Sequence, residues 1–178
     1  MGRAYPGHEL RLVDGEIAVK VAADPVVFLG YWRDHAATAA KVRDGWLHTG
    51  DLAEVDDEGN YRSIGRVDDL ISSAGHRIGP GEIEECLIRH PSVSIAAVIG
   101  VPDAIRGELV KAFVVTNAGT AGTPELVTEL QQLVRTRLAP YEVPRQIEFV
   151  EELPLTVTGK IRRAELRDRS AQSAGEGA

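Results

Sequence analysis

The sequence predicts an α+β fold in two parts, a small antiparallel β-barrel over residues 1–65 and an α+β domain over residues 66–169. Two observations lead to this prediction. Short alternating runs separated by turn residues fill the first part, whereas segments with helical spacing alternate with apolar runs after Gly65. The second part has the order helix, strand, strand, helix, strand, helix, which predicts helices over one face of a small sheet. Residues 170–178 are small and polar, and we expect a disordered tail there.

The first part begins with a hairpin. Glu9–Val13 and Glu16–Val21 are short runs on either side of Asp14-Gly15, a dipeptide typical of two-residue hairpin turns. A short helix is predicted over Asp34–Val42. Further strands are predicted at Val26–Leu29, Trp46–His48, Leu52–Val55 and Tyr61–Ile64. This succession predicts a small, strongly twisted antiparallel sheet or barrel.

The second part opens with a helix at Gly79-Pro80-Gly81, whose apolar side chains Ile83, Cys86 and Leu87 share one face and which Pro91 ends. A second helix begins at Thr123-Pro124-Glu125, which offers a side-chain cap, a first-turn proline and an acid near the positive end of the helix dipole. Its apolar stripe consists of Leu126, Leu130, Leu133, Val134 and Leu138. Strands are predicted at Val93–Val101, Leu109–Thr116 and Gln146–Val150, and a last helix at Ala164–Arg169.

Composition excludes several classes of function. Of the 178 residues, 43% are hydrophobic and 26% charged, as in globular proteins of one or two small domains. The net charge of -7 argues against non-specific nucleic-acid binding, and the single cysteine excludes an internal disulfide. No apolar run approaches the roughly 20 residues that span a bilayer, and Met1–His8 lacks the apolar core of a signal peptide. We expect a cytoplasmic protein without a membrane span.

Two segments near the end of the first part carry candidate site residues. In Trp46–Asp51, the carboxylate of Asp51 follows a Thr-Gly turn and can accept hydrogen bonds from a vicinal diol such as a ribose, or it only stabilises the turn. In Gly65–Asp69, Arg66 can bind phosphate or ribose oxygens and Asp68 can serve as a pivot between the two parts. A surface cluster of salt bridges is the alternative for this segment.

The most specific segment is Ser72–Glu84. Small residues at positions 72–75 allow a thin ligand to run close to the backbone. Arg77 supplies a planar fork suited to a phosphate, whereas His76 by itself is more often a structural or solvated histidine.

Lys160 lies on a Thr/Gly-flanked, mobile-looking loop within Leu153–Arg162, directly after an apolar strand. A lysine there is a compact charge that can approach an anion and leave again, although a solvated loop lysine has the same pattern.

These segments, taken in order, resemble the AMP-forming acyl-CoA synthetases, a family that also contains luciferases and the adenylation domains of peptide synthetases. The resemblance covers nearly the whole chain, from about Gly2 to Arg169. The helix start at Gly79–Glu84 and the run Arg106–Val115 are most similar to the medium-chain, acetyl-CoA synthetase-like branch. These two segments make a peptide-synthetase module the less favoured interpretation.

The resemblance implies that such an enzyme activates a carboxylic acid, expected to be fatty, with ATP to an acyl-adenylate and then transfers the acyl group to CoA. It implies that Asp51 holds the ribose hydroxyls of ATP and that Arg66 and Arg77 lie near the ribose and phosphate. Asp68 would be the hinge between the half-reactions, and Lys160 the catalytic lysine of the first. CoA contacts are implied for Ala74, Gly75, His76, Arg106, Arg135 and Arg145.

The role of a lysine follows from the charges. A carboxylate and the α-phosphate of ATP are both anions, and charge builds on the phosphoryl oxygens in the transition state, where a bridging cation offsets it. Rotation about Asp68 would then remove Lys160 and bring in Gly75, so that the CoA thiol can attack the acyl-adenylate.

The resemblance also implies a longer enzyme, in which residues 1–65 form the final β-barrel of a large N-terminal domain. The acyl pocket, the adenine pocket and the glutamate that binds Mg²⁺ are expected outside this sequence, so no metal ligand is predicted within it. Two interpretations stay open. The chain acts with an N-terminal domain or a separate partner chain, or it is a catalytically incomplete module that binds CoA or AMP.

A barrel separated from the domain on which it packs should expose an apolar face, which favours homodimerisation or poor solubility. The candidate residues are Val26, Val27, Phe28, Leu29, Tyr31 and Trp32.

Overall fold

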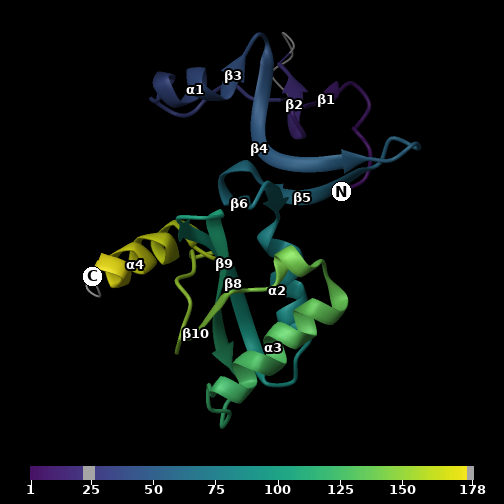
Figure 1. The fold of residues 1–178 in the computed structure, drawn as a ribbon. Coiled ribbons are helices and arrows are strands. Elements are labelled where there is room, and N and C mark those ends of the chain that lie inside the picture. The colour runs from purple at the N-terminus through teal and green to yellow at the C-terminus, as the bar shows by residue number, and fades with distance from the viewer. Residues whose placement is uncertain (22–26, 176–178) are drawn as a thin grey trace. The chain divides into compact units, whose positions relative to one another are not determined.

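The computed structural model describes residues 1–21 and 27–175. The chain divides into two compact units, Met1–Asp68 and Asp69–Ala178. Figure 1 shows the strands and helices of each unit. The fold is α+β, as the sequence predicts. No helix among these described residues is long and apolar enough to cross a membrane.

The first unit is built on an antiparallel sheet with the strand order β1-β2-β4-β3, in which β5 also pairs with β4. Its strands are β1 (Leu10–Val13), β2 (Glu16–Lys20), β3 (Val42–Arg43), β4 (Trp46–Val55) and β5 (Tyr61–Arg66). The predicted hairpin is confirmed, because Val13 pairs with Glu16 and both turn residues have positive φ, 52° at Asp14 and 86° at Gly15.

Strand β4 corrects the sequence-based prediction. The two short strands expected at Trp46–His48 and Leu52–Val55 are one strand of ten residues, and the expected Thr-Gly turn lies inside it. Gly50 has a φ of 80° there, and the pairing with β5 shifts register between Leu52 and Ala53. The strand therefore bends without ending, as Figure 1 shows.

The connection between β2 and β3 differs from the expected strand at Val26–Leu29. Val26 lies outside the described residues, and positions 27–29 are irregular. Helix α1 (His35–Lys41) follows, and Asp34 caps it by accepting a hydrogen bond from Ala37 N at 2.8 Å. A short 3₁₀ turn, η1 (Val67–Asp69), comes after β5.

The second unit has a sheet with the order β10-β9-β6-β7, in which β8 pairs with β9. Strand β10 runs parallel to β9, and the other pairs are antiparallel. The strands are β6 (Ile71–Ser73), β7 (His76–Ile78), β8 (Val93–Asp103), β9 (Gly107–Thr116) and β10 (Gln146–Phe149). The helical elements are α2 (Pro80–Ile88), α3 (Pro124–Arg137), the 3₁₀ turn η2 (Pro140–Glu142) and α4 (Arg163–Gly175).

Helices cover both faces of this sheet, not one face as the sequence suggested. Val98 of β8 packs in the core formed with α2 and α3, whereas its neighbour Ile99 packs with Phe113 of β9 and Leu166 of α4. Figure 1 shows α4 on the opposite side of β8 and β9 from α2 and α3. Burial on both faces explains why β8 has an uninterrupted apolar run rather than an alternating one.

The helix starts agree with the predictions. Pro80 is the first residue of α2, and Thr123 caps α3 by accepting from Leu126 N at 3.3 Å. The end of α4 does not agree, because residues 170–175, expected in a disordered tail, continue the helix. An ion pair between Glu165 and Arg169, 2.6 Å apart and one turn along the helix, stabilises the turn of α4 that precedes this segment.

Candidate functional site

Asp51 and Arg66 face each other across β4 and β5. They are direct partners in the register of the sheet, and Arg66 Nη1 donates to Asp51 Oδ1 at 2.8 Å. Nη2 of the same arginine lies 3.6 Å from Asp68 Oδ2. The structure thus brings together three of the predicted site residues in one cluster. The side chains of Arg66 and Asp51 are 45% and 44% exposed, so a ligand can reach both charges.

A second layer of polar contacts holds Asp51, and its members were not predicted from the sequence. Glu16 accepts from Gly50 N at 2.7 Å and lies 2.9 Å from His48 Nδ1. Thr49 Oγ1 accepts from Asp51 N at 3.1 Å. Burial raises the pKa of Glu16, but the hydrogen bonds from His48 and Gly50, with the charges of His48 and Lys41, outweigh it and leave this pKa below its ordinary value.

Close packing surrounds the bend in β4. A β-carbon built on Gly50 would lie 2.6 Å from Arg66 Nη2, so only glycine leaves room for this guanidinium beside Asp51. The dipeptide Thr49-Gly50 in the sequence was the available signal, although it suggested a turn rather than a packed bend.

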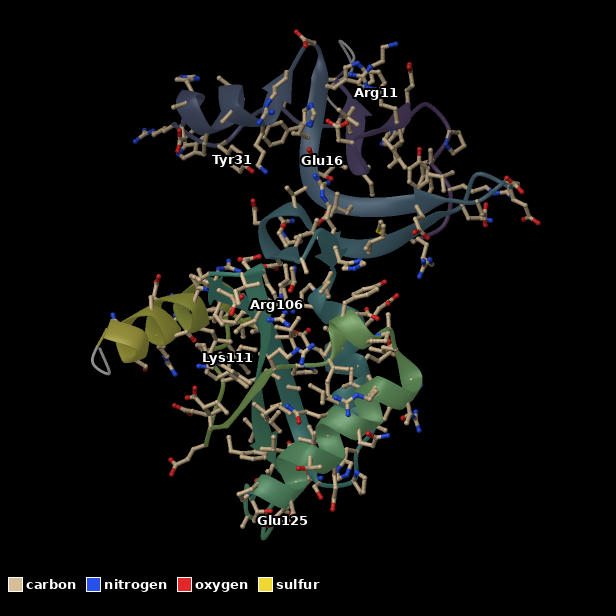
Figure 2. The ribbon with its side chains drawn as sticks, in the orientation of Figure 1. Arg11, Glu16, Tyr31, Arg106, Lys111 and Glu125 are labelled. Carbon is tan, nitrogen blue, oxygen red and sulfur yellow. The ribbon has the colours of Figure 1, made fainter. Side chains whose placement is uncertain are left out.

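The second unit contains a groove of about 370 Å³ at one end of its sheet. Four of the six predicted CoA residues line it, namely Ala74, His76, Arg106 and Arg145. The other lining residues are Ser73, Val110, Pro140 and Tyr141. Figure 2 shows Arg106 at this end of the unit and Glu125, at the start of α3, at the far end.

Two neighbouring turns hold this groove. The β6–β7 turn has positive φ at Ala74 (49°) and at Gly75 (84°), and Ala74 N donates to Arg106 O at 2.9 Å. Asp103 Oδ1 accepts from Arg106 N at 2.7 Å and from Ile105 N at 3.1 Å, which fixes the β8–β9 turn. These two hydrogen bonds lower the pKa of Asp103. Arg106 is therefore fixed at its backbone while its side chain is exposed.

An aromatic pair forms one wall of the groove. The rings of His76 and Tyr141 stack with centroids 3.9 Å apart and an interplanar angle of 7°. Sequence reasoning named His76 but not Tyr141, whose position between Pro140 and Pro144 was the only local signal. The stack offers a flat surface of the kind on which a planar group packs.

Two predicted arginines are not among the residues that line the groove. Arg77 follows His76 on β7, so its side chain leaves the strand on the other face. Arg135 lies on α3, where Nη1 contacts Gln132 Oε1 at 3.3 Å. Arg135 therefore does not lie with the predicted CoA residues that line the groove, because its position on α3 directs its side chain away from them.

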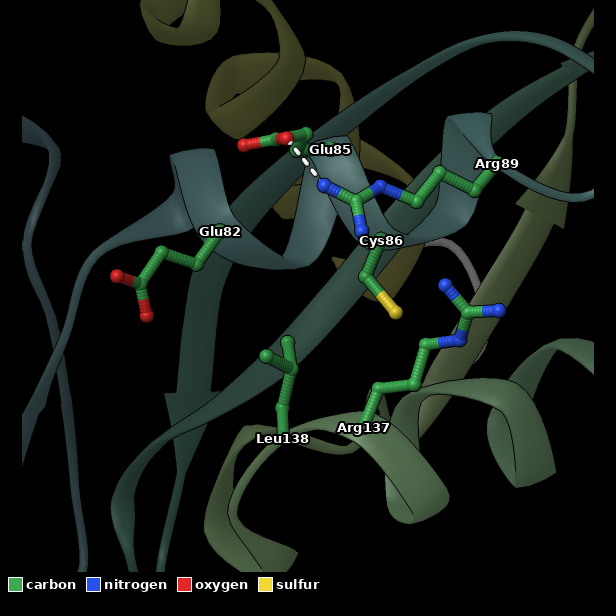
Figure 3. Close-up of a pocket in the computed structure, with 6 residues that line it drawn as sticks. All are labelled: Glu82, Glu85, Cys86, Arg89, Arg137 and Leu138. Carbon is green, nitrogen blue, oxygen red and sulfur yellow. Dashed lines mark hydrogen bonds and ion pairs between the residues drawn. The ribbon is translucent and has the colours of Figure 1, made fainter.

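Arg137, two residues further along α3, lies beside a second cavity of about 270 Å³ between α2 and α3. In Figure 3, Cys86 Sγ points toward the space between Leu138 and Arg137, and a dashed line marks the 2.6 Å ion pair of Arg89 with Glu85. Burial raises the pKa of the Cys86 thiol, although Arg137 and Arg89 oppose this, so the thiol is a poor nucleophile.

Lys160 is exposed at the end of a hydrogen-bonded turn, where the sequence suggested a mobile loop. Thr156 N donates to Lys160 O at 2.8 Å, and Lys160 N donates to Thr156 Oγ1 at 3.0 Å. Gly159 has a φ of 79° and donates from its backbone to Thr156 O at 2.9 Å. The backbone of the turn is thus fixed, while the Lys160 side chain projects into solvent.

Comparison with known proteins places this arrangement in a family. Residues 82–160 match the AMP-binding enzyme C-terminal domain. The chain is 43% identical to 4-hydroxybutyrate–CoA ligase 1 of Metallosphaera sedula, over 99% of this chain and 34% of that protein. It is 43% identical to the human mitochondrial acyl-coenzyme A synthetase ACSM2B, over 99% of this chain and 33% of that protein. The chain belongs to the AMP-forming acyl-CoA synthetase family.

Solved structures agree with this assignment. The crystal structure of the anthranilate CoA ligase AuaEII in complex with anthranoyl-AMP has a TM-score of 0.86 and 34% identity, covering 98% of this chain and 35% of that one. The chain spans about a third of the length of the acyl-CoA synthetase relatives that it matches, and it corresponds to their carboxyl-terminal part.

Proposed function

We propose that the chain contributes the carboxyl-terminal part of an acid–CoA ligase. In the first half-reaction, a carboxylate oxygen of the acid attacks the α-phosphorus of ATP and pyrophosphate leaves, which gives an acyl-adenylate. In the second, the CoA sulfur attacks the acyl carbon, the thiol proton is lost and AMP leaves, which gives the thioester. A cytoplasmic location remains our prediction, and the names of the ACSM relatives assign those proteins to mitochondria.

The observation that carries the proposal is the groove of the second unit. It combines two exposed arginines, Arg106 and Arg145, with the stacked rings of His76 and Tyr141. Arginine forks suit the phosphates of CoA, and the small residues Ala74 and Gly75 leave room for its thin pantetheine arm. We propose that CoA binds along this groove.

The Asp51–Arg66 cluster is our proposed ribose site for ATP. A carboxylate accepts hydrogen bonds from both hydroxyls of a vicinal diol, and the guanidinium that pairs with Asp51 offers a further donor to the ligand. Asp68, the last residue of the first unit, is our proposed hinge between the two half-reactions. Arg77 is proposed to contact phosphate.

Lys160 is our proposed catalytic residue of adenylation. Its ammonium would lie between the attacking carboxylate and the α-phosphate and would offset the charge that develops on the phosphoryl oxygens. The fixed turn at Thr156–Lys160 supports this role, since a held backbone lowers the entropy cost of placing the charge.

Magnesium is expected with ATP, yet the residues described here do not fit a site for it. They contain no group of three or more His, Cys, Asp or Glu side chains placed to hold a metal. We therefore derive no step through Mg²⁺ and propose that its ligand belongs to the N-terminal part of the enzyme.

That N-terminal part, or a separate chain that supplies it, is the proposed partner. Leu29 and Trp32 of the first unit are each 86% exposed, and Tyr31 is 47% exposed. Val27 and Phe28 are half-buried, and Val26 lies outside the described residues. An apolar patch of this kind favours a partner surface. Self-association into a homodimer through the same patch is the competing outcome.

The test uses the chain alone and the chain joined to the N-terminal two thirds of the Metallosphaera sedula relative, here called the fused enzyme. Each is incubated with ATP, Mg²⁺, CoA and a panel of carboxylic acids, and AMP and thioester are measured. We expect turnover only in the fused enzyme, and a loss of about 10²–10³-fold in Lys160→Ala, because a charge that stabilises the transition state is removed.

Lys20→Ala is the matched control, because Lys20 is a surface lysine paired with Glu9 at 2.7 Å. Its turnover should be unchanged. Calorimetric CoA binding by the chain alone, without turnover in either protein, would favour the binding-module interpretation. Full activity of Lys160→Ala in the fused enzyme would overturn the catalytic assignment.

A further inference from the structure

A buried ionic network joins three segments of the second unit, away from the residues that line the groove. Arg163, at the start of α4, donates through Nη2 to both carboxylate oxygens of Glu84 on α2, at 2.9 and 2.7 Å. Its Nη1 donates to Asp69 Oδ2 at 3.2 Å, and Arg167, one turn further along α4, contacts Asp69 Oδ1 at 3.4 Å. The side chains of Arg163, Glu84 and Asp69 are 19%, 11% and 14% exposed.

The network has the features of a rigid connection. Nη2 of Arg163 contacts Glu84 while Nη1 contacts Asp69, so the planar guanidinium is held in orientation as well as in distance. Glu84 Oε1 also accepts from Val98 N at 2.8 Å, which ties the network to strand β8 of the sheet. Two arginines face two carboxylates, so loss of one partner leaves a charge buried without compensation.

The position of the network in the chain connects it with the proposed chemistry. Arg163 is three residues after Lys160, and Asp69 directly follows the proposed hinge residue Asp68. Between Lys160 and Arg163 the backbone is also held, because Arg162 N donates to Pro154 O at 2.8 Å and Leu155 pairs with Ile161. The backbone between Lys160 and Arg163 forms the base of the Lys160 turn. Arg163 therefore holds this base in place.

We infer that Arg163 is a positioning residue for Lys160. Its contacts with Glu84 and Asp69 hold the base of the Lys160 turn in a fixed place relative to the residue that follows the hinge. Arg163 itself touches no reacting group. The inference rests on the proposed function, and it predicts that only adenylation, the half-reaction assigned to Lys160, depends on Arg163.

A purely structural role would have a different signature. If the network only fastened α4 to the unit, its loss would weaken both half-reactions and the overall stability together. The discriminating variant is Arg163→Lys, which keeps the charge but loses the planar fork that reaches Glu84 and Asp69 simultaneously. Arg162→Lys is the matched control, because Arg162 is 58% exposed and pairs with Glu165 at 2.9 Å.

The first measurement is amide hydrogen exchange of the chain alone, followed by mass spectrometry over residues 155–162. In Arg163→Lys we expect exchange in this segment to be about tenfold faster or more, with α3 unchanged, because breaking a buried pair opens the local structure. Arg162→Lys should exchange like the parent chain. Unchanged exchange in Arg163→Lys would overturn the inference, and this measurement requires no catalytic activity.

The second measurement separates the half-reactions in the fused enzyme. Pyrophosphate exchange into ATP reports adenylation, and thioester formation from a synthetic acyl-adenylate and CoA reports the transfer. We expect Arg163→Lys to lower the first about tenfold and to leave the second within about twofold, since a misplaced catalytic charge affects only its own step. An equal fall in both rates would overturn the inference in favour of a purely structural role.

Lys160→Ala separates this inference from the proposed function. If Lys160→Ala leaves adenylation unchanged, the proposed role of Lys160 fails, and with it the link from Arg163 to catalysis. If Lys160→Ala abolishes adenylation but Arg163→Lys does not reduce it, the inference alone fails. Should Arg163→Lys not fold, Asp69→Asn weakens the network while keeping the pair with Glu84, and the same selective loss of adenylation is expected.

Discussion

Gly50 and Arg66 pack so closely that a β-carbon at position 50 would lie 2.6 Å from Arg66 Nη2. The same guanidinium donates to Asp51 at 2.8 Å. The bend in β4 and the ion pair of the proposed ribose site therefore depend on one another. A side chain at position 50 must displace Arg66 or straighten the strand.

Gly50→Ala should cost about 1–2 kcal/mol in the free energy of unfolding, because Gly50 has a φ of 80°. It should also raise the KM for ATP in the fused enzyme, because Arg66 moves away from Asp51. Gly59→Ala is the matched control: φ is 81° there, but nothing lies within 4 Å of an added β-carbon. Urea unfolding and steady-state kinetics measure both effects. Equal KM values in the two variants would contradict the proposed coupling.

A second prediction concerns the pH dependence that Glu16 gives to the first unit. The folded-state pKa of Glu16 is lowered, so its contribution to stability is present above the ordinary value of 4.5 and is lost as the pH falls through the folded pKa. Glu16→Gln should therefore be about 1 kcal/mol less stable than the parent chain at neutral pH, with the difference shrinking below pH 4.5.

Urea unfolding at a series of pH values measures this difference. Glu9→Gln is the control, because the Glu9 side chain is 58% exposed and pairs with Lys20 on the surface, where such pairs contribute little. A Glu16→Gln difference that stays constant down to pH 3 would show that the hydrogen bonds, not the charge, are responsible.

A third prediction tests the proposed CoA groove with two of the arginines for which the resemblance implies CoA contacts. Arg106 lines the groove, whereas Arg135 contacts Gln132 on α3. Arg106→Ala should weaken CoA binding about tenfold or more, because a charge-assisted contact to phosphate is lost, and Arg135→Ala should leave it unchanged. Calorimetric titration of the chain with CoA gives both values. A larger loss in Arg135→Ala would move the binding site to α3.

Local signals in the sequence predicted the elements that local interactions determine. The Asp14-Gly15 hairpin and the cap at Thr123 each depend on neighbouring residues, and both are present. The course of β4 could not be predicted in this way. Thr49-Gly50 has the composition of a turn, but pairing with β2 on one side and β5 on the other carries the strand through it. An apolar run in β8 likewise indicates burial without showing that α4 covers the second face.

The same distinction between local and long-range contacts applies to the candidate sites. Ala74 and His76, which are two positions apart in the chain, were predicted to belong to one site, and both line the groove. Tyr141 was missed because it stacks on His76 only after segments far apart in the sequence meet. Asp103 was missed although it holds the backbone of Arg106 only three residues away. Arg163 was also missed, since its partners Glu84 and Asp69 are far from it in the sequence.

Glu84 gives the last prediction, with a pH dependence opposite to that of Glu16. Burial raises its pKa, and the hydrogen bonds and charge of Arg163 only partly oppose this. Between the ordinary value of 4.5 and the raised folded value, the folded chain holds a proton that the unfolded chain has released. The contribution of Glu84 to stability therefore falls as the pH rises through that window.

Glu84→Gln mimics the protonated side chain, so the stability of the parent chain relative to this variant should decrease as the pH rises from 4.5 and then become constant. Urea unfolding across this range provides the measurement, and Glu85→Gln is the control, because the neighbouring Glu85 side chain is 69% exposed. A relative stability that increases with pH would mean that the contacts with Arg163 outweigh the cost of burying the Glu84 carboxylate. Arg163 would then stabilise the ionised network beside Lys160 more strongly than burial opposes it.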